Sequence, residues 1–221
     1  DSAALLDGVH TQSFVHFNPR ECVLPPGGEI ILDFGLELHG LLTVTTGCMK
    51  LSRARITFGE SVSETLGTPT QDHAIHQELL SLPQLGQVNF GQTAFRFVRL
   101  EIPADAPEVR LIGVVATAIY RDWEYRGTFL SDDERLNRIW EVGAYTVHLN
   151  CQDYIYDGVK RDRLVWMGDL YPEIRTILAA FDETALVEKS LDFVRDHTPD
   201  DKWMNTASSY SCWWVICQRD F

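Results

Sequence analysis

The sequence predicts a chain of two parts, an antiparallel β-sandwich over residues 1–122 followed by helices over residues 123–221. Up to about Tyr120, short β-rich runs alternate with Gly and Pro, which is typical of strands joined by turns. After Arg121, apolar residues recur every three or four positions, as on one face of a helix. A chain of 221 residues is long enough for two modest domains that each have a core.

Five runs are predicted as strands of the sandwich. In one of them, Ala54, Ile56 and Phe58 alternate with polar residues, which indicates a strand with one buried face. Several such strands separated by turns favour a sandwich of two packed sheets. The predicted strands cover residues 29–34, 41–46, 53–58, 94–102 and 109–120.

The segment 63–92 is predicted to be a long connection between strands, because it contains Pro69, Pro83 and three Gly. His73 and His76 lie three positions apart in it, a spacing found among metal ligands. No third ligand is evident nearby, so the sequence predicts neither a metal site nor a cofactor.

Four helices are predicted in the second part. Ser131 and Glu134 have the spacing of a capping box, and the helix that follows would bury an apolar stripe. The second helix would begin with Asp169 as N-cap and end at Phe181, and the third would cover residues 185–196. A strongly apolar fourth helix would include residues 213–221. The predicted stripe of the first helix consists of Leu136, Ile139, Trp140, Gly143 and Val147.

Composition excludes several classes of function. Lys and Arg number 19 against 32 Asp and Glu, and the net charge of -13 disfavours nucleic acid and anionic membranes as partners. The five Cys are scattered without a C-x-x-C pair, so neither a disulfide framework nor a zinc knuckle is indicated. No run of about 18 apolar residues is present. We expect a cytoplasmic protein, with a periplasmic or secreted one as the alternative.

The run from Asp157 to Asp169 is the strongest functional signal. It holds three carboxylates, three basic residues and Trp166 within thirteen positions, a density of charge that is costly to bury. Glycoside hydrolysis requires a protonated carboxyl group, further carboxylates that bind hydroxyls, and an aromatic face for a sugar ring. The run therefore indicates a sugar-processing site, and a solvated loop with paired charges is the alternative.

The spacing of Asp157, Asp162, Trp166 and Asp169 resembles the signature of the bacterial α-L-rhamnosidases, glycoside hydrolase family 78. Two features depart from that signature. Gly158-Val159 stands where Cys-Pro is usual, and Asp162 occupies a position commonly filled by a general-acid Glu. Upstream, residues 33–40 and 58–60 resemble the concanavalin-like, or jelly-roll, sandwich that precedes the catalytic domain of this family.

The resemblance implies a fold and a reaction. The second part would be the first helices of an (α/α)6 barrel, so the chain would be a fragment of a six-hairpin glycosidase. The parent protein would hydrolyse terminal α-L-rhamnosides with inversion. The expected partner is a rhamnose-containing oligosaccharide or glycoside, and self-association of the chain is a further option, since an incomplete barrel exposes apolar helix faces.

The resemblance implies roles for five residues of the run. Asp162 would be the general acid, which requires burial or nearby carboxylates because Arg161 and Arg163 flank it. Asp157, Arg161, Trp166 and Asp169 would bind the sugar. The family's general base, a Glu in a later loop, matches no position here, so the fragment alone is expected to be inactive.

Other interpretations remain open from the residues alone. Asp169 is a good helix cap, Trp166 is a good core residue, and Arg161 could form a structural ion pair. The parent could also bind carbohydrate without hydrolysing it, or be another six-hairpin glycosidase or lyase with a different sugar. Convergence of Asp157, Asp162 and Asp169 beside Trp166 is the feature that a catalytic site requires.

Overall fold

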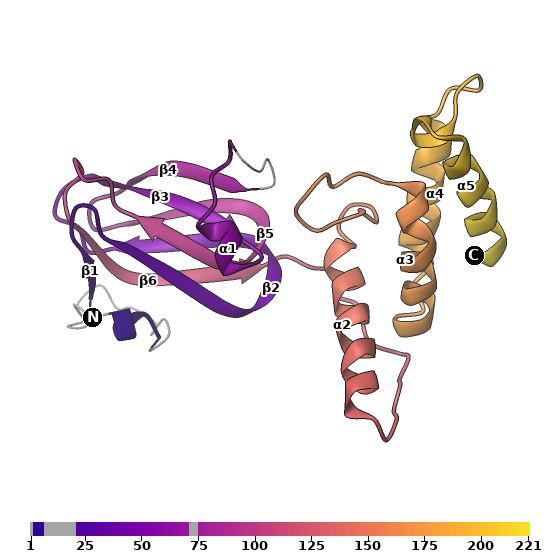
Figure 1. The fold of residues 1–221 in the computed structure, drawn as a ribbon, viewed down its shortest axis with the longest axis horizontal. Helices are drawn as coiled ribbons and strands as arrows, with labels where there is room; N and C mark the ends of the chain where they lie inside the picture. Colours follow the sequence, from indigo (N-terminus) through magenta and orange to yellow (C-terminus); the bar gives the residue numbers. More distant parts are fainter. Residues whose placement is uncertain (1, 7–20, 71–74) are drawn as a thin grey trace. The chain divides into compact units, whose positions relative to one another are not determined.

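The computed structural model describes residues 2–6, 21–70 and 75–221. The chain divides into two compact units, Asp1–Ile119 and Tyr120–Phe221. The first unit is a β-structure and the second consists of helices (Figure 1).

In the described residues of the first unit, six antiparallel strands form one hydrogen-bonded sheet in the order β1-β6-β2-β5-β3-β4. A 3-10 helix, η1 (Ser2–Leu6), and a short helix, α1 (Val62–Thr65), accompany them. The strands are β1 (Cys22–Leu24), β2 (Glu29–Thr46), β3 (Ser52–Gly59), β4 (His76–Leu82), β5 (Gln87–Glu101) and β6 (Val109–Ala118).

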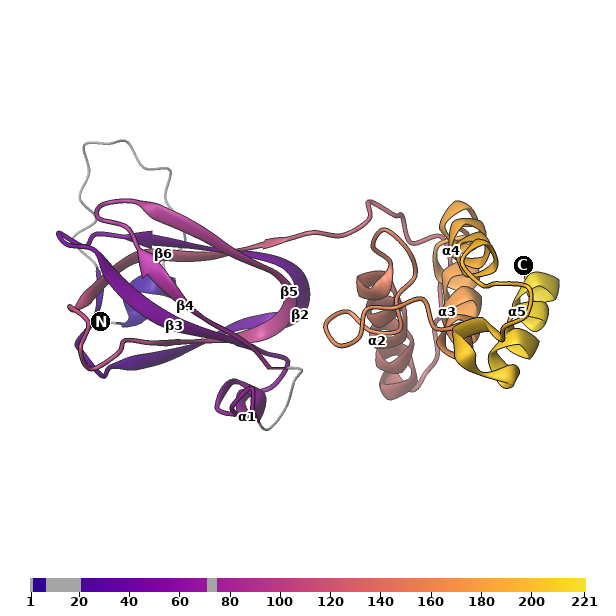
Figure 2. The ribbon, with the colours of Figure 1, turned by 90° about the horizontal axis from the view of Figure 1, so that it is seen from above.

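This sheet folds over itself because its two longest strands pass from one layer to the other. The first residues of β2 pair with the end of β5, which also pairs with β3. The second half of β2 pairs with β6 and with the start of β5. The register of β2 against β5 shifts between Asp33 and Leu38, where the strands bend (Figure 2). The result is a β-sandwich of two layers.

The core of the sandwich lies between these layers. Phe58 and Phe95 are fully buried with ring centroids 4.8 Å apart. The buried face predicted for β3 is confirmed, since Ala54, Ile56 and Phe58 are all at most 1% exposed, although Thr57 on the opposite face is buried as well.

The segment 63–92 is not the long connection that the sequence predicts. It contains most of α1, all of β4 and the start of β5. The side chain of His76, in β4, forms a hydrogen bond with Thr93 Oγ1, and His73 lies outside the described residues. The described residues contain no group of three or more His, Cys, Asp or Glu arranged to hold a metal ion. Within the same residues, every helix is too short or too polar to span a membrane.

The second unit consists of α2 (Glu134–Asn150), α3 (Met167–Ala180), α4 (Ala185–Asp196) and α5 (Ser208–Asp220), with a 3-10 turn, η2 (Met204–Thr206), before α5. Apolar residues of α3 and α4, among them Ile174, Ile177, Val187 and Leu191, form its core together with Cys217 of α5. The bounds predicted for the third helix, 185–196, are confirmed by α4.

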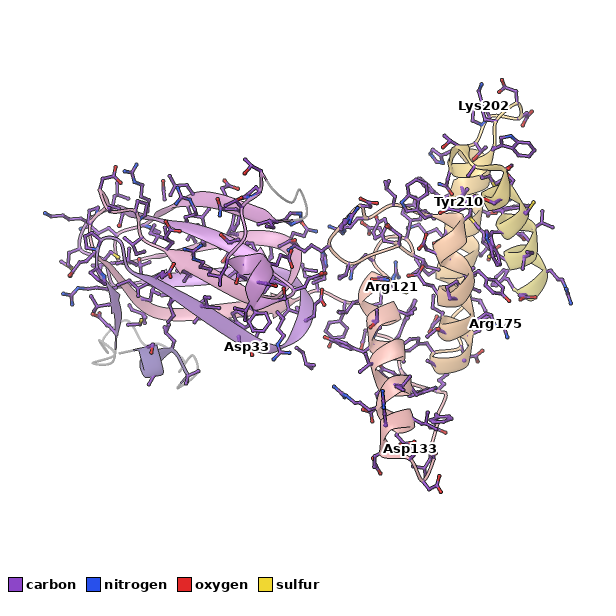
Figure 3. All side chains as sticks on the ribbon, viewed as in Figure 1. Asp33, Arg121, Asp133, Arg175, Lys202 and Tyr210 are labelled. Carbon is purple, nitrogen blue, oxygen red and sulfur yellow. The ribbon has the colours of Figure 1, made fainter. Side chains whose placement is uncertain are left out.

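The predicted N-caps of the first two helices are wrong, by two residues in the first helix and by three in the second. The N-cap of α2 is Asp133, whose carboxylate accepts from Arg135 N at 2.8 Å (Figure 3). Ser131 lies outside the helix, where its hydroxyl accepts from Asp133 N at 3.1 Å. The helix α3 begins at Met167, so Asp169 lies inside its first turn and is not the N-cap.

The apolar stripe predicted for the first helix is also largely wrong. Leu136 and Ile139 are 46% and 59% exposed. The buried residues of α2 lie in its second half and include Ala144, His148 and Leu149. Spacing alone identified an apolar face, but only the part of that helix near α3 and Phe181 is packed.

Candidate active site

The loop between α2 and α3, residues 151–166, carries most of the predicted site residues. Two hydrogen bonds join Asp157 and Leu164 within this loop. The backbone N of Asp157 donates to Leu164 O at 3.0 Å, and Asp157 Oδ1 accepts from Leu164 N at 2.8 Å. Between these two residues, Asp162 and Arg163 have φ angles of 56° and 53°. Residues with side chains rarely adopt this left-handed conformation, and such strain is concentrated at functional sites.

The charges of Asp162 and Asp169 act on Asp157. Burial raises the pKa of Asp157, and the negative charges of Asp162 and Asp169 raise it further, against the opposing hydrogen bond from Leu164 N. Asp157 is half-buried, whereas the side chain of Asp162 is 43% exposed and lies 3.8 Å from the Arg161 guanidinium. The structure thus brings Asp157, Asp162 and Asp169 into one electrostatic cluster, with Asp157 the most buried of the three.

Glu173 is a fourth member of this cluster that sequence reasoning missed. It lies on α3 one turn after Asp169 and is only 6% exposed. Its Oε1 accepts from Asn150 Nδ2 at 2.8 Å, and its Oε2 has no hydrogen-bond partner among the described residues. Burial, together with the charges of Asp169 and Asp157, raises the pKa of Glu173 to about 8. A buried carboxyl group with this pKa is neutral at pH 7.

A sequence signal for Glu173 does exist. Leu170, Ile174 and Ile177 recur at helical spacing and are buried, and Glu173 occupies the same face of α3. A carboxyl group on the core face of an amphipathic helix is costly unless it is neutral or paired, which marks it as a functional candidate.

Asn205 holds the backbone on both sides of Trp166. Its Nδ2 donates to Val165 O at 3.1 Å, and its Oδ1 accepts from Met167 N at 3.0 Å. Because a carbonyl only accepts and an amide N–H only donates, the orientation of the Asn205 side chain is fixed by its two partners. Trp166, the N-cap of α3, makes no side-chain cap hydrogen bond, so Asn205 caps the helix in its place. Asn205 has a left-handed φ of 47°.

Trp166 itself is half-buried and packs edge-on against Tyr210, with ring centroids 5.7 Å apart. The neighbouring Gly168 leaves room for the same ring, since a Cβ at this position would lie 2.8 Å from Tyr210 Cε1. Two residues of the run, Trp166 and Gly168, are therefore part of the packing between α3 and α5. The exposed Arg161 extends from the loop, and its nearest ionic partner is Asp162.

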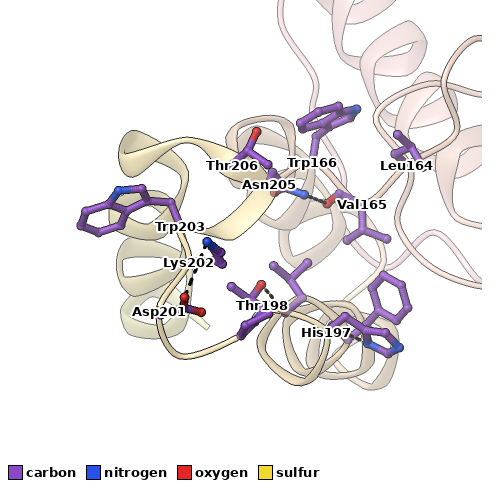
Figure 4. Close-up of a pocket in the computed structure, with 13 residues that line it drawn as sticks. Leu164, Val165, Trp166, His197, Thr198, Asp201, Lys202, Trp203, Asn205 and Thr206 are labelled. Carbon is purple, nitrogen blue, oxygen red and sulfur yellow. Dashed lines mark hydrogen bonds and ion pairs between the residues drawn. The ribbon is translucent and has the colours of Figure 1, made fainter.

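A cavity of about 640 Å3 lies beside Trp166 (Figure 4). Asp157, Asp162, Asp169 and Glu173 do not line it. The residues that do are Leu164, Val165, Trp166, Phe193, Val194, His197, Thr198, Pro199, Asp201, Lys202, Trp203, Asn205 and Thr206.

Replacement of Asn205 by Asp is expected to lower the free energy of unfolding of the helical unit by about 1–3 kcal/mol. The carboxylate keeps an acceptor for Met167 N but places a negative oxygen against Val165 O. Chemical denaturation followed by tryptophan fluorescence measures the change. Ser211→Ala, which removes the acceptor for Met204 N in the same region, is the control for loss of a single hydrogen bond. Equal destabilisation by the two variants would contradict the conclusion that both hydrogen bonds of Asn205 stabilise this unit.

Residues 124–218 match the family described as the bacterial alpha-L-rhamnosidase 6 hairpin glycosidase domain. This part of the chain is similar to that family. The rhamnosidase match covers the carboxylate cluster, Trp166 and Asn205. Comparison with curated protein sequences finds no match.

One solved structure shares the fold over most of this chain. A rhamnosidase from Klebsiella oxytoca, solved with rhamnose bound, aligns with a TM-score of 0.76 at 22% identity. The alignment covers 91% of this chain and 45% of the Klebsiella chain, so this chain spans less than half of that rhamnosidase. A truncated AlyQ with CBM32 and alginate lyase domains aligns over 48% of this chain and 28% of its own, at 11% identity and a TM-score of 0.36.

Proposed function

We propose that the protein to which this chain belongs is a glycoside hydrolase that removes terminal α-L-rhamnose from oligosaccharides or other glycosides with inversion at the anomeric carbon. The family of residues 124–218 supports the reaction class. The observation that carries the proposal is the group of four carboxyl groups on the loop before α3 and on the first two turns of α3, in which Asp157 and Glu173 both have raised pKa values. The four helices would then be the first helices of an (α/α)6 barrel.

Inverting hydrolysis requires one carboxyl group in its acid form beside the glycosidic oxygen. The acid that the motif implies is Asp162, but burial and neighbouring negative charge support Asp157 for this role. Asp157 is the more buried of the two, and both neighbouring carboxylates favour its protonated form. We therefore propose that Asp157 donates the proton to the leaving group.

The other residues of the loop bind and orient the sugar in this proposal. Asp162 and Asp169 accept hydrogen bonds from sugar hydroxyls, and Arg161 donates to them. Trp166 forms a wall of the site whose position is fixed by Asn205. Glu173 is buried and neutral, so it adds no further negative charge beside Asp157 and Asp169.

The second carboxylate, which activates water on the opposite face of the sugar, would lie about 6.5–9.5 Å from the acid in an inverting enzyme. The base that the resemblance implies matches none of these 221 residues. We propose that the 221 residues alone hydrolyse no rhamnoside and that a parent protein with the complete six-hairpin domain supplies the base.

The reaction is tested with such a parent protein and phenyl α-L-rhamnoside. We expect hydrolysis in which 1H NMR detects β-L-rhamnose as the first product, because inversion at an α-glycoside gives the β anomer. The 221-residue chain is the control and should release no rhamnose. First formation of the α anomer would contradict inversion. Binding of rhamnosides by the parent without turnover would instead favour a carbohydrate-binding protein.

A further inference from the structure

Glu173 and Asn150 form a buried hydrogen-bonded pair between two helices. The two residues are 6% and 7% exposed, and Asn150 Nδ2 donates to Glu173 Oε1 at 2.8 Å. Asn150 is the last residue of α2, and Glu173 lies in the second turn of α3. Buried polar side chains are costly unless they are hydrogen-bonded, so the two residues stabilise each other. The pair therefore fixes the end of α2 against α3 (Figure 1).

The backbone that leaves Asn150 leads directly to Asp157. It turns back on itself through an isolated antiparallel bridge, and Tyr156 N then donates to Asn150 O at 3.1 Å. Asp157 is the next residue, and its two hydrogen bonds with Leu164 hold it on the other side. The position of Asp157 thus depends on two anchors. One is Leu164, and the other is Asn150, whose side chain is held by Glu173.

We infer that Glu173 is a positioning residue for Asp157, which it holds in place through Asn150 and the turn that follows. The inference rests on the proposed function, in which Asp157 belongs to the active site. It concerns only the placement of Asp157 and applies whether that residue is the acid or binds a hydroxyl group.

The neutral form of Glu173 suits this role. Its Oε2 has no hydrogen-bond partner among the described residues, so an ionised Glu173 would leave a negative charge buried without compensation. A neutral carboxyl group still accepts from Asn150 through Oε1. Gln has the same shape, is neutral and retains that acceptor, so it should replace Glu173 in this role.

Hydrogen exchange of the 221-residue chain, followed by NMR, tests the placement without any substrate. Glu173→Leu removes the acceptor for Asn150 and keeps a side chain of similar size. We expect the amide of Tyr156 to exchange about tenfold faster in this variant, because the turn opens locally more often. Amides in the middle of α4 should keep their rates, which separates a local effect from a loss of overall stability. Glu173→Gln should exchange like the wild type.

Kinetics of a parent protein with the complete six-hairpin domain test the effect on the reaction. Glu173→Leu should lower kcat for methyl α-L-rhamnoside by about 10–100-fold, since a displacement of about 1 Å can cost 10²-fold in rate. Glu173→Gln should restore most of this loss. In an Asp157→Asn background, Glu173→Leu should cause little further loss, because residues that act through one another are not additive.

Asn150→Ala breaks the same pair from its other side and keeps the backbone oxygen that accepts from Tyr156. It should reproduce the faster exchange and the lower kcat, and it decides the question if Glu173→Leu does not fold. Glu188→Leu is the matched control, because Glu188 is exposed on α4, and it should behave like the wild type.

Three results would overturn the inference: wild-type exchange of the Tyr156 amide in Glu173→Leu and Asn150→Ala, no rescue by Glu173→Gln, or full additivity of Glu173→Leu with Asp157→Asn. Failure of the proposed function gives a different result. If the variants loosen Tyr156 as expected but the parent hydrolyses no rhamnoside, Glu173 still positions Asp157 and the rhamnosidase activity is wrong.

Discussion

Asp157→Asn in a parent rhamnosidase is expected to reduce turnover of an unactivated rhamnoside by about 10²–10⁴-fold, the usual contribution of a general acid. Methyl α-L-rhamnoside needs a proton on its leaving oxygen, whereas a dinitrophenyl rhamnoside leaves without one. The same variant should therefore affect the activated substrate far less. Steady-state kcat/KM for both substrates measures the difference.

Asp162→Asn is the matched comparison, because it removes the neighbouring carboxylate of the same loop. We expect it to lower kcat/KM for both substrates to a similar extent, as loss of a sugar-binding group does. If Asp162→Asn shows the substrate-dependent loss and Asp157→Asn does not, the acid is Asp162, as the motif implies. An equal loss on both substrates in both variants would move the acid role to another carboxyl group.

Glu173 is expected to make the chain less stable as the pH rises from about 4 to 8. In the unfolded chain a Glu has a pKa of about 4.3, and in the folded chain burial raises the pKa of Glu173 to about 8. Below pH 4 both states hold the proton and the stabilising contribution is complete. Between these values only the unfolded state releases the proton, so the free energy of unfolding falls by about 1.4 kcal/mol per pH unit at most.

Glu173→Gln removes this titration and keeps an oxygen to accept from Asn150. We expect the variant to match the wild type near pH 4.5 and to exceed its stability by several kcal/mol at pH 8. Urea denaturation at the two pH values measures the effect. Glu188→Gln, at an exposed position of α4, is the control and should follow the wild type. A Glu173→Gln variant with the wild-type pH dependence would contradict the neutral state of Glu173.

The sequence predicts those elements whose local pattern matches their environment. The third helix, 185–196, has its apolar residues on one buried face, and its predicted bounds agree with α4. The strand β4 was not predicted. It lies at the edge of the sheet and exposes both Glu78 and Leu79, so its residues do not alternate between buried and exposed.

The N-cap position of α2 depends on a hydrogen-bonded contact that the capping-box spacing does not include. Both Ser131 and Asp133 are good N-cap residues. The side chain of Asn137 exchanges hydrogen bonds with Ser131, accepting from its N at 2.7 Å and donating to its O at 3.0 Å. Ser131 is thereby held outside the helix, and Asp133 becomes the cap.

The site was predictable to a similar degree. The spacing of the run 157–169 identified a cluster of carboxylates around one loop, because those residues are close in sequence. Asn205 acts on Val165 and Met167 from about forty positions away, so only the fold reveals it. Glu173 lies between these cases, since its place on the core face of α3 is visible in the sequence but its neutral state depends on burial.

The two strands that pass between the layers of the sandwich have a consequence for folding. Because β2 and β5 belong to both layers, each of these two strands contributes pairs to both layers. These pairs join residues far apart in the chain, such as Glu29 with Glu101. To form such pairs, the chain must close long loops before the new contacts stabilise it. This loss of entropy slows folding. We expect the β-structure to form late, in a single cooperative step, and to resist partial unfolding once it has formed.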